Sequence, residues 1–444
     1  MSDARPAGLG VVDASLLVVG SIVGAGIFLV SGAVAGLVHS PAAFLGTWVL
    51  GGAVALAGAL SNGELGGLFP RSGGEYVYLR EAYGPAFGFL SGWTAFWIAF
   101  PGSIASLASG LGATVAPMLG LAGDVAPKVI GIAAIVALTS INALGLRPGK
   151  WTQNTLSATK LAAFAVLLVL GAVVARPSAG GLSPFFAPGD RPAGVATALI
   201  PVLFAYSGWN AATYVAGEMR HPRHGLGRAL AFGTGACALL YVAVNAVYLR
   251  ALPLAGLASA DNPARAAAEA LGGSAGAAVL SPLVAVCVLS SMQASVLVGP
   301  RIYQAMATDG VFFSSLGRVH PRSGAPVTAL VAQGAIAVAQ LLSGRFDQLV
   351  GFTMFAIVAF STLTVGAVIV LRVRRPAAER AFHVPGYPWV PLFFIVVNVW
   401  MLWNVLTFGE QGPLHALVGL AIVGLGVPAY AAFRARARSR ETGR

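Results

Sequence analysis

The chain has 444 residues, of which 57% are hydrophobic and 9% are charged, and its formal net charge is +12. About a quarter of the residues in a soluble domain are charged, so this composition, with a mean hydropathy of +0.81, indicates a protein that crosses a membrane several times. The positive charges lie between the apolar segments, which argues against a nucleic-acid partner, and both cysteines, Cys237 and Cys287, lie inside such segments, which argues against an extracellular disulfide framework.

Apolar segments long enough to cross a bilayer, which takes about 20 residues in a helix, predict twelve transmembrane helices. They span residues 11–37, 42–68, 84–115, 128–146, 152–175, 193–217, 229–250, 276–305, 325–343, 348–371, 389–408 and 413–433. The first segment follows a short polar stretch and is too long for a cleaved signal, so we expect it to be retained as a helix.

The arginines and lysines predict the orientation of the chain in the membrane. If residues 1–10 are cytoplasmic, the segments on that side hold 20 of the 27 basic residues and the segments on the other side hold six. This imbalance follows the positive-inside rule, so we expect both termini in the cytoplasm of a cell whose inner membrane holds the protein. The basic tail, residues 434–444, would then anchor the topology or contact anionic lipid.

The first predicted helix is interrupted by glycine. Gly20, Gly24 and Gly26 lie within seven residues, in the stretch Gly20-Ser21-Ile22-Val23-Gly24-Ala25-Gly26-Ile27-Phe28. Glycine disfavours a continuous helix, and a break inside the bilayer leaves backbone groups that only a protein-lined cavity can satisfy. The stretch therefore predicts a binding site, although small residues also allow two membrane helices to pack closely.

The sixth predicted helix contains a second interruption, Phe204-Ala205-Tyr206-Ser207-Gly208-Trp209-Asn210. Serine, glycine and asparagine weaken a helix and offer polar groups, while the flanking aromatic side chains are suited to closing over a small ligand. A simple kink is the alternative interpretation. Interrupted helices at corresponding positions of two halves indicate the substrate site of a secondary transporter at an inverted repeat.

Lys160 lies inside the fifth predicted helix, about eight residues from its start and so about 12 Å deep. Ionisable residues within a membrane usually face the interior of the bundle and mark a transport pathway. The alternative is a lysine that extends its side chain to the membrane surface. In helix eight, Ser290 and Ser291 offer hydroxyl groups to a substrate or ion, or to their own backbone.

These motifs resemble those of the amino acid-polyamine-organocation superfamily, and are close to its bacterial L-amino acid transporter branch. The resemblance covers almost the whole chain, and its further motifs are Gly73-Gly74-Glu75-Tyr76-Val77-Tyr78-Leu79, Gly217-Glu218 through Pro222, and Gly299-Pro300-Arg301. It implies an all-α membrane protein with the leucine-transporter fold. Helices 1–5 (11–175) and 6–10 (192–373) would form a 5+5 inverted repeat, followed by two extra helices (389–433).

The resemblance also implies the roles of individual residues in sodium-independent amino acid transport by alternating access. Amides of Gly24, Ala25 and Gly26 would hold the substrate carboxylate, at the N-terminus of a half-helix. Lys160 would occupy the space that sodium fills in sodium-coupled relatives, and Tyr241 would join its network. The carbonyl groups that would accept hydrogen bonds from the substrate ammonium belong to Ile22, Phe204, Ala205 and Ser207. Phe204 would gate the site, with Trp209 and Asn210 beside it.

Departures from the family pattern favour neutral L-amino acids as substrates. Relatives with cationic substrates carry an acidic residue at the position of Ser207, and we expect no carboxylate near the pocket. No cysteine lies between helices three and four to link a heavy chain, so we expect a monomer or weak homodimer without such a partner. The resemblance implies no cofactor and no metal.

Other functions are weighed against this interpretation. An enzyme would need a nucleophile with a base or a set of metal ligands, and the chain has no His-Glu-x-x-His motif. The stretch Gly145 to Trp151 is one residue short of a phosphate-binding loop and lacks its Ser or Thr, which argues against a primary pump. A polyamine or cationic amino acid transporter, a channel and a nutrient sensor remain alternatives, as do exchange and proton symport within transport.

Overall fold

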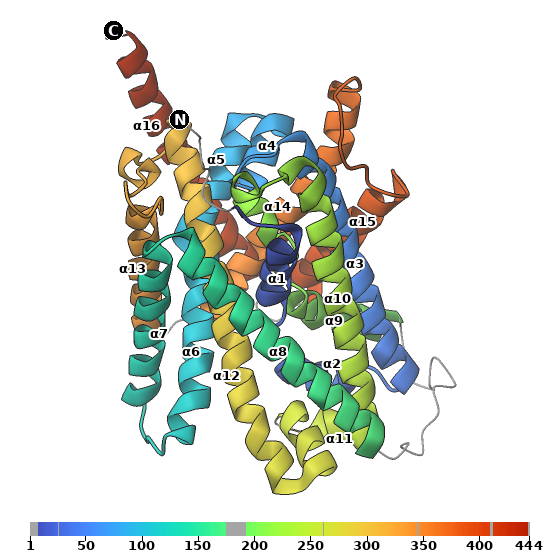
Figure 1. The fold of residues 1–444 in the computed structure, drawn as a ribbon. Coiled ribbons are helices and arrows are strands. Elements are labelled where there is room, and N and C mark those ends of the chain that lie inside the picture. The colour runs from blue at the N-terminus through green and yellow to red at the C-terminus, as the bar shows by residue number, and fades with distance from the viewer. Residues whose placement is uncertain are drawn as a thin grey trace.

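The described part of the chain is a bundle of helices (Figure 1). The structure, a computed structural model, describes residues 8–24, 26–174, 192–260, 262–343, 346–408 and 412–442. Within these residues no strand forms, and Leu9 and Met219 make one isolated bridge. The helices are α1 (Val11–Ile22), α2 (Gly26–Leu37), α3 (Pro41–Leu68), α4 (Glu75–Tyr83), α5 (Pro85–Thr94), the π-helical turn η1 (Ala95–Ala99), α6 (Phe100–Met118), α7 (Val125–Ala143), α8 (Leu146–Val174), α9 (Pro192–Ala205), the 3₁₀ helix η2 (Ala211–Glu218), α10 (Pro222–Ala251), α11 (Leu254–Ser259), α12 (Pro263–Thr308), the 3₁₀ helix η3 (Ser314–Gly317), α13 (Val327–Ser343), α14 (Phe346–Arg374), α15 (Trp389–Phe408) and α16 (Gly412–Thr442).

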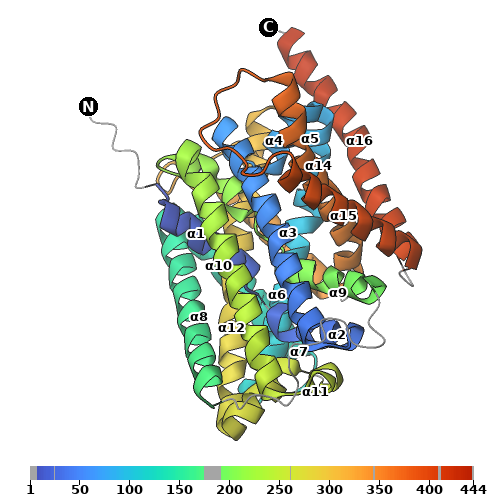
Figure 2. The same cartoon turned by 90° about the vertical axis from the view of Figure 1, so that its right-hand side faces the viewer.

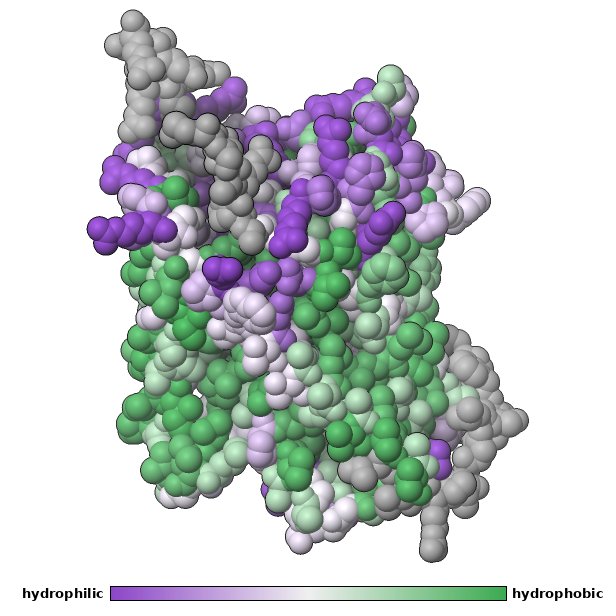
Figure 3. Space-filling view, viewed as in Figure 1, coloured by the Kyte–Doolittle hydropathy of each residue, from purple (hydrophilic) through white to green (hydrophobic). Residues whose placement is uncertain are grey.

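The bundle has the length and surface of a membrane domain. Among the described residues, eight helices are long and apolar enough to cross a bilayer, and four further apolar helices are shorter. Large apolar side chains point outward from these helices, including Val173, Phe232 and Leu239, which are 79%, 66% and 76% exposed. Hydrophilic side chains gather at the end where α4 and the C-terminal part of α16 lie (Figures 1 and 3). The chain is therefore a multi-pass membrane protein.

Both predicted interruptions are present as breaks between helices. The first predicted segment is divided into α1 and α2, the chain leaves the helix at Val23 and Gly24, and the two pieces lie in different halves of the bundle (Figure 2). The sixth predicted segment is divided into α9 and the 3₁₀ helix η2, joined by a turn at residues 206–210. We refer to these as the first and second breaks. Their position inside the bundle confirms that the glycine-rich stretches interrupt helices.

Some predicted boundaries differ from those of the structure. The helix that carries Lys160 begins at Leu146 rather than at residue 152, which places Lys160 fourteen residues, about 21 Å, from its start. The charged stretch between helices two and three contains a helix, α4, and α16 continues to Thr442 through most of the predicted basic tail. Charge and turn residues were therefore poor guides to helix ends outside the apolar core.

The first break lies at the centre of the bundle because α1 packs against α8, α10 and α12. The second break approaches it through α9, which packs against α2 and α3. Small residues allow the close approach: a Cβ added to Gly51 of α3 would lie 2.3 Å from Val202 of α9. This packing brings segments nearly 200 residues apart in sequence to one site.

Candidate functional site

The first break leaves backbone carbonyl groups without helical partners. Val23 follows the last residue of α1 with a ψ of 84°, and the amide of Gly24 donates to the carbonyl oxygen of Ile22 at 2.9 Å. In a continuous helix that amide would instead donate to the carbonyl of Gly20, four residues earlier. The carbonyl oxygens of Gly20 and Val23 are thus available to side chains from other helices.

Lys160 of α8 and Ser291 of α12 both donate to these two carbonyl oxygens. The Lys160 ammonium lies 3.0 Å from the oxygen of Gly20 and 2.7 Å from that of Val23, and the Ser291 hydroxyl lies 2.8 and 3.2 Å from the same atoms. Lys160 is fully buried, so its side chain does not extend to the membrane surface. A cation at this place also complements the partial negative charge at the C-terminal end of α1.

The second break is built around Gly208, which has a φ of +98°. Residues with a Cβ rarely adopt that conformation, and a Cβ on Gly208 would lie 2.4 Å from the hydroxyl oxygen of Ser21 at the end of α1, next to the first break. Likewise, a Cβ added to Gly26 would lie 3.1 Å from the Cα atom of Ala205. The two breaks therefore touch each other through glycine.

Tyr241 of α10 ties the two breaks together. Its hydroxyl lies 2.9 Å from the carbonyl oxygen of Ile22 and 3.1 Å from that of Ala205. A hydroxyl has one hydrogen, so the two carbonyl oxygens share it. The phenol ring is fully buried and packs edge-on against Trp48, with ring centroids 5.6 Å apart. Tyr241 consequently fixes the relative position of the first and second breaks.

Replacing Tyr241 with Phe should lower stability by about 1 kcal/mol, because the hydrogen bond shared by the two breaks is lost. Tyr248 on the same helix provides a matched control: its hydroxyl is buried and has no hydrogen-bond partner among the described residues. Thermal unfolding of both variants checks the prediction. An equal effect of Tyr248→Phe would show that the hydrogen bonds of Tyr241 are unimportant.

A cavity of about 850 Å³ lies between the two breaks. Its lining extends from Glu75 and Tyr76, towards the polar end of the bundle, to Asp124 and Lys128 near the connection of α6 and α7. The predicted site residues that line it are Ile22, Gly24, Gly26, Phe204, Ala205, Ser207, Asn210 and Ser291. Ala25 lies outside the described residues. The structure thus brings most of the predicted binding residues to one cavity.

Four other predicted site residues lie behind this cavity or beside it. Trp209 packs against Phe394 of α15, with ring centroids 5.5 Å apart, and lines a second cavity of about 380 Å³. The hydroxyl of Ser290 lies 3.3 Å from that of Ser157 and contacts neither break. Lys160 and Tyr241 support the breaks from behind, as described above. The roles predicted for these residues remain predictions.

Three of the four predicted substrate-binding carbonyl groups already accept hydrogen bonds from the protein in this structure. The oxygen of Ile22 accepts from Gly24 and Tyr241, that of Ala205 accepts from Tyr241, and that of Phe204 accepts from the amide of Ser207 at 3.0 Å. A carbonyl oxygen has two lone pairs, so those of Phe204 and Ala205 retain capacity for a substrate ammonium.

Glu75 contradicts the expectation that no carboxylate lies near the pocket. Its side chain is 9% exposed and lines the cavity, where the amide of Asn210 donates to it at 3.0 Å. Gly73 and Gly74, with φ of +123° and +53°, turn the chain so that α4 begins inside the bundle. The Gly-Gly-Glu sequence was the available signal, but charged and turn residues between two apolar segments are also typical of an ordinary connector.

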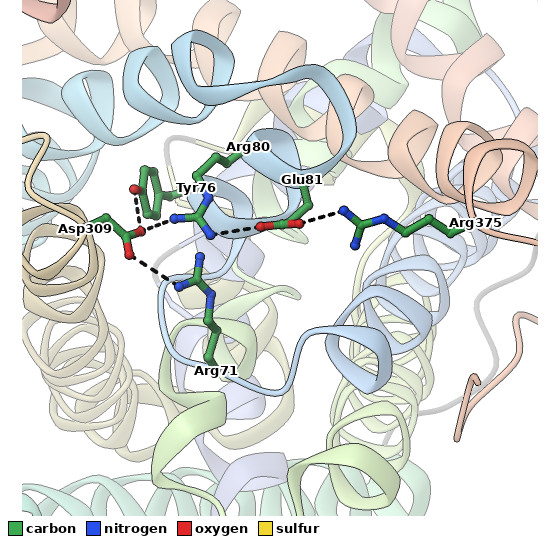
Figure 4. Close-up of polar contacts among 6 residues, drawn as sticks. All are labelled: Arg71, Tyr76, Arg80, Glu81, Asp309 and Arg375. Carbon is green, nitrogen blue, oxygen red and sulfur yellow. Dashed lines mark hydrogen bonds and ion pairs between the residues drawn. The ribbon is translucent and has the colours of Figure 1, made fainter. Parts of the chain in front are cut away.

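A network of charged side chains closes the polar end of the bundle (Figure 4). Asp309 at the end of α12 accepts hydrogen bonds from Tyr76 at 2.6 Å, from Arg80, and from Arg71 at 3.4 Å. Arg80 also donates to Glu81, which pairs with Arg375 beyond α14. Burial acts to raise the pKa of Glu81, but hydrogen bonds from the two arginines outweigh it and the pKa is lowered. This network joins α4 to α12 and the end of α14.

A second set of contacts closes the same end next to α1. The buried guanidinium of Arg301 donates to the Glu218 carboxylate at 2.9 Å, and the amide of Leu9 donates to the carbonyl of Glu218 at 2.8 Å. Arg220 in turn donates to the carbonyl of Gly8. The segment before α1 is thereby held against the end of η2. These contacts lie on the polar side of the cavity, and its lining continues in the opposite direction to Asp124 and Lys128.

Two broken membrane helices that meet at one cavity, with a buried lysine at the first break, define a membrane protein of the transporter class. The amino acid permease family model matches residues 9–427, and the chain belongs to this family, within the amino acid-polyamine-organocation superfamily.

Similar proteins cover nearly the whole chain. The serine/threonine exchanger SteT of Bacillus subtilis is 32% identical over 437 residues, which are 97% of this chain and 98% of that protein. The Asc-type amino acid transporter 1 of Mus musculus is 30% identical over 433 residues, 95% of this chain and 80% of that protein. The b(0,+)-type amino acid transporter 1 of Mus musculus is 27% identical over 407 residues, 89% and 81% of the two chains.

Proposed function

We propose that this protein is a secondary active, sodium-independent transporter of neutral L-amino acids that works by alternating access. The observation that carries the proposal is the meeting of both helix breaks at one cavity, with Lys160 bound to the carbonyl oxygens of the first break. The N-terminus of α2 suits a substrate carboxylate, and carbonyl oxygens of the second break suit an ammonium.

Sodium independence is supported by the position of the Lys160 ammonium. It lies within 3.0 Å of two carbonyl oxygens that would otherwise suit a bound cation. A second positive charge at the same atoms would be repelled by the first in this water-excluded interior. The lysine thus supplies permanently the cation that a sodium-coupled transporter must bind.

Small neutral amino acids are the proposed substrates, and exchange or proton symport the proposed mode. The relative from Bacillus subtilis is named as a serine/threonine exchanger, so L-serine, L-threonine and L-alanine are the first substrates to test, followed by larger neutral amino acids. Ser207, which lines the cavity, is neutral where relatives with cationic substrates carry an acid.

The membrane topology belongs to the same proposal. Twelve spans arranged as a 5+5 inverted repeat and two extra helices would place α1 and α9 as the first members of the two halves. The excess of basic residues on one side supports cytoplasmic termini in the inner membrane. We further propose a monomer or weak homodimer without a disulfide-linked heavy chain.

Counterflow in proteoliposomes tests the function. Liposomes preloaded with unlabelled L-serine should take up labelled L-serine faster than empty liposomes. The reason is that the transporter returns to its outward-facing state while it carries internal L-serine. The same assay with L-alanine and L-leucine covers the other neutral substrates. Absence of trans-stimulated uptake for all of them would favour a nutrient sensor or channel.

A transporter of polyamines or cationic amino acids is the second candidate, favoured by one observation: the Glu75 carboxyl group lines the cavity. Strong competition by spermidine or cadaverine against labelled L-serine would support this candidate. Competition by L-alanine and L-threonine, with no effect of the diamine, would support neutral substrates.

A further inference from the structure

Glu75 is an acidic residue inside the cavity and is held by neutral groups. Its carboxyl oxygen accepts hydrogen bonds from the side-chain amide of Asn210 and from the hydroxyl of Ser361, each at 3.0 Å. Asn210 ends the second break, and Ser361 lies on α14. One carboxyl group therefore connects α4, the second break and α14.

Two other acids of the bundle, the buried Glu64 and the partly buried Glu218, are paired with arginine. Glu64 lies 2.6 Å from Arg372 and Glu218 lies 2.9 Å from Arg301, while the ion pairs formed by the described residues do not include Glu75. A buried carboxylate without a cation is costly, and accepting a proton removes that cost. Glu75 is thus placed to exist in both protonation states.

The neighbours of Glu75 leave its charge uncompensated. The nearest titratable groups are hydroxyls: that of Tyr78 on α4, and that of Tyr214 on η2, to which Asn210 also donates at 2.9 Å. Helix α5, which packs against α4, contains no titratable side chain, and Ser361 of α14 is neutral. The charged groups on this part of α12 are engaged elsewhere: Arg301 with Glu218, and Asp309 with Arg80 and Arg71.

Burial raises the pKa of Glu75 to about 7, against the opposing effect of the hydrogen bonds from Ser361 and Asn210. The carboxyl group is therefore mostly protonated below this pH and mostly ionised above it. Both forms are populated at neutral pH, and the cavity supplies a route for water and protons to reach the group.

We propose that Glu75 is a proton-binding group of the transport cavity and that its ionisation sets how tightly the second break is held to α4 and α14. The proposal rests on the transport function proposed above. In the ionised form, the hydrogen bonds from Asn210 and Ser361 are charge-assisted, which makes them roughly twice as strong as neutral ones.

Protonation loosens this connection. The Glu75 carboxylate takes one proton from a hydronium ion in the cavity, which leaves water, and the neutral acid accepts weaker hydrogen bonds from Asn210. The second break must move against its surroundings during alternating access, so weaker attachment lowers the barrier to that movement. Amino acid transport is therefore expected to accelerate as the pH falls through about 7.

The pH profile of exchange tests the proposal. Proteoliposomes with equal pH on both sides, from about 5.5 to about 8.5, measure labelled L-serine entry against internal L-serine. The wild type should exchange several-fold faster at the acidic end. Glu75→Gln resembles the protonated form and should stay fast at every pH, Glu75→Asp should keep a pH dependence, and Glu379→Gln, which changes an exposed acid, should match the wild type. A pH dependence that persists in Glu75→Gln, or a folded but inactive Glu75→Gln, would overturn the proposal.

A second measurement keeps this test separate from that of the proposed function. Amide hydrogen exchange over residues 204–218, corrected for the intrinsic effect of pH, reports directly on the second break. We expect the wild type to gain protection above about pH 7 and Glu75→Gln to lack that gain. If exchange of all amino acids fails but this difference is present, the transport function is wrong and the proton-binding role of Glu75 stands. An identical protection profile in both proteins rejects the role.

Discussion

Replacing Lys160 with Ala should reduce L-serine exchange by at least about tenfold at equal amounts of protein in the membrane. The ammonium group holds the carbonyl oxygens of Gly20 and Val23, and only Ser291 would remain to donate to them. The buried volume of the side chain would also be left empty. The first break, which carries the proposed carboxylate site, would lose its geometry. Uptake by proteoliposomes, normalised to protein detected in the membrane, measures the effect.

Two further variants separate the charge of Lys160 from its volume. Lys160→Met retains most of the volume without the ammonium group, so a similar loss of exchange would assign the effect to charge and hydrogen bonding. Arg318→Ala removes an exposed basic side chain that does not line the cavity and should leave the rate close to that of the wild type. Unchanged exchange in Lys160→Ala would remove the case for a coupling role.

The helix breaks could be predicted because their cause is local. Glycines at positions 20, 24 and 26, and Ser207 with Gly208, disfavour a helix wherever they occur in an apolar segment. The structure confirms both interruptions and also the burial of Lys160. It is the tertiary packing of α8, however, that decides which carbonyl oxygens Lys160 reaches, and no local pattern encodes that packing.

The rotation of each helix about its axis could not be predicted from the sequence, for a related reason. Helices that are apolar on all sides give no periodic signal for the face that points inward. Ser290 and Ser291 are neighbours in sequence, yet Ser291 binds the first break while Ser290 contacts Ser157. Trp209 likewise faces Phe394 rather than the main cavity. Neighbouring residues of one helix differ in direction by about 100°, so an unknown rotation leaves each assignment open.

Glu75 was missed because it lies in a charged stretch between two apolar segments, and such stretches are typical of surface connectors. The two glycines before it adopt positive φ, and this bends the chain back into the bundle. Gly74 also fits closely against Tyr214, since an added Cβ would lie 2.4 Å from the ring. A Gly-Gly pair directly before an acidic residue is therefore a reason to place that acid inside a membrane protein, and not only at its surface.

Replacing Gly208 with Ala should reduce exchange by about tenfold or more while the protein remains folded. Alanine at a φ of +98° costs about 1–3 kcal/mol of backbone strain, and its Cβ would lie 2.4 Å from the Ser21 hydroxyl and 3.0 Å from the Ser21 carbonyl carbon. The two breaks would be forced apart, and the substrate groups that each is proposed to bind could no longer be held together. Initial rates of L-serine exchange measure the loss.

Gly235 of α10 provides the matched control for this substitution. It lies within a helix, and no atom lies within 4 Å of an added Cβ, so Gly235→Ala should raise stability by up to about 1 kcal/mol through helix propensity and leave exchange unchanged. Thermal unfolding in detergent distinguishes the two variants from misfolded protein. If Gly208→Ala exchanges L-serine as fast as Gly235→Ala, contact between the two breaks does not shape the substrate site, and the first break alone would have to bind the amino acid.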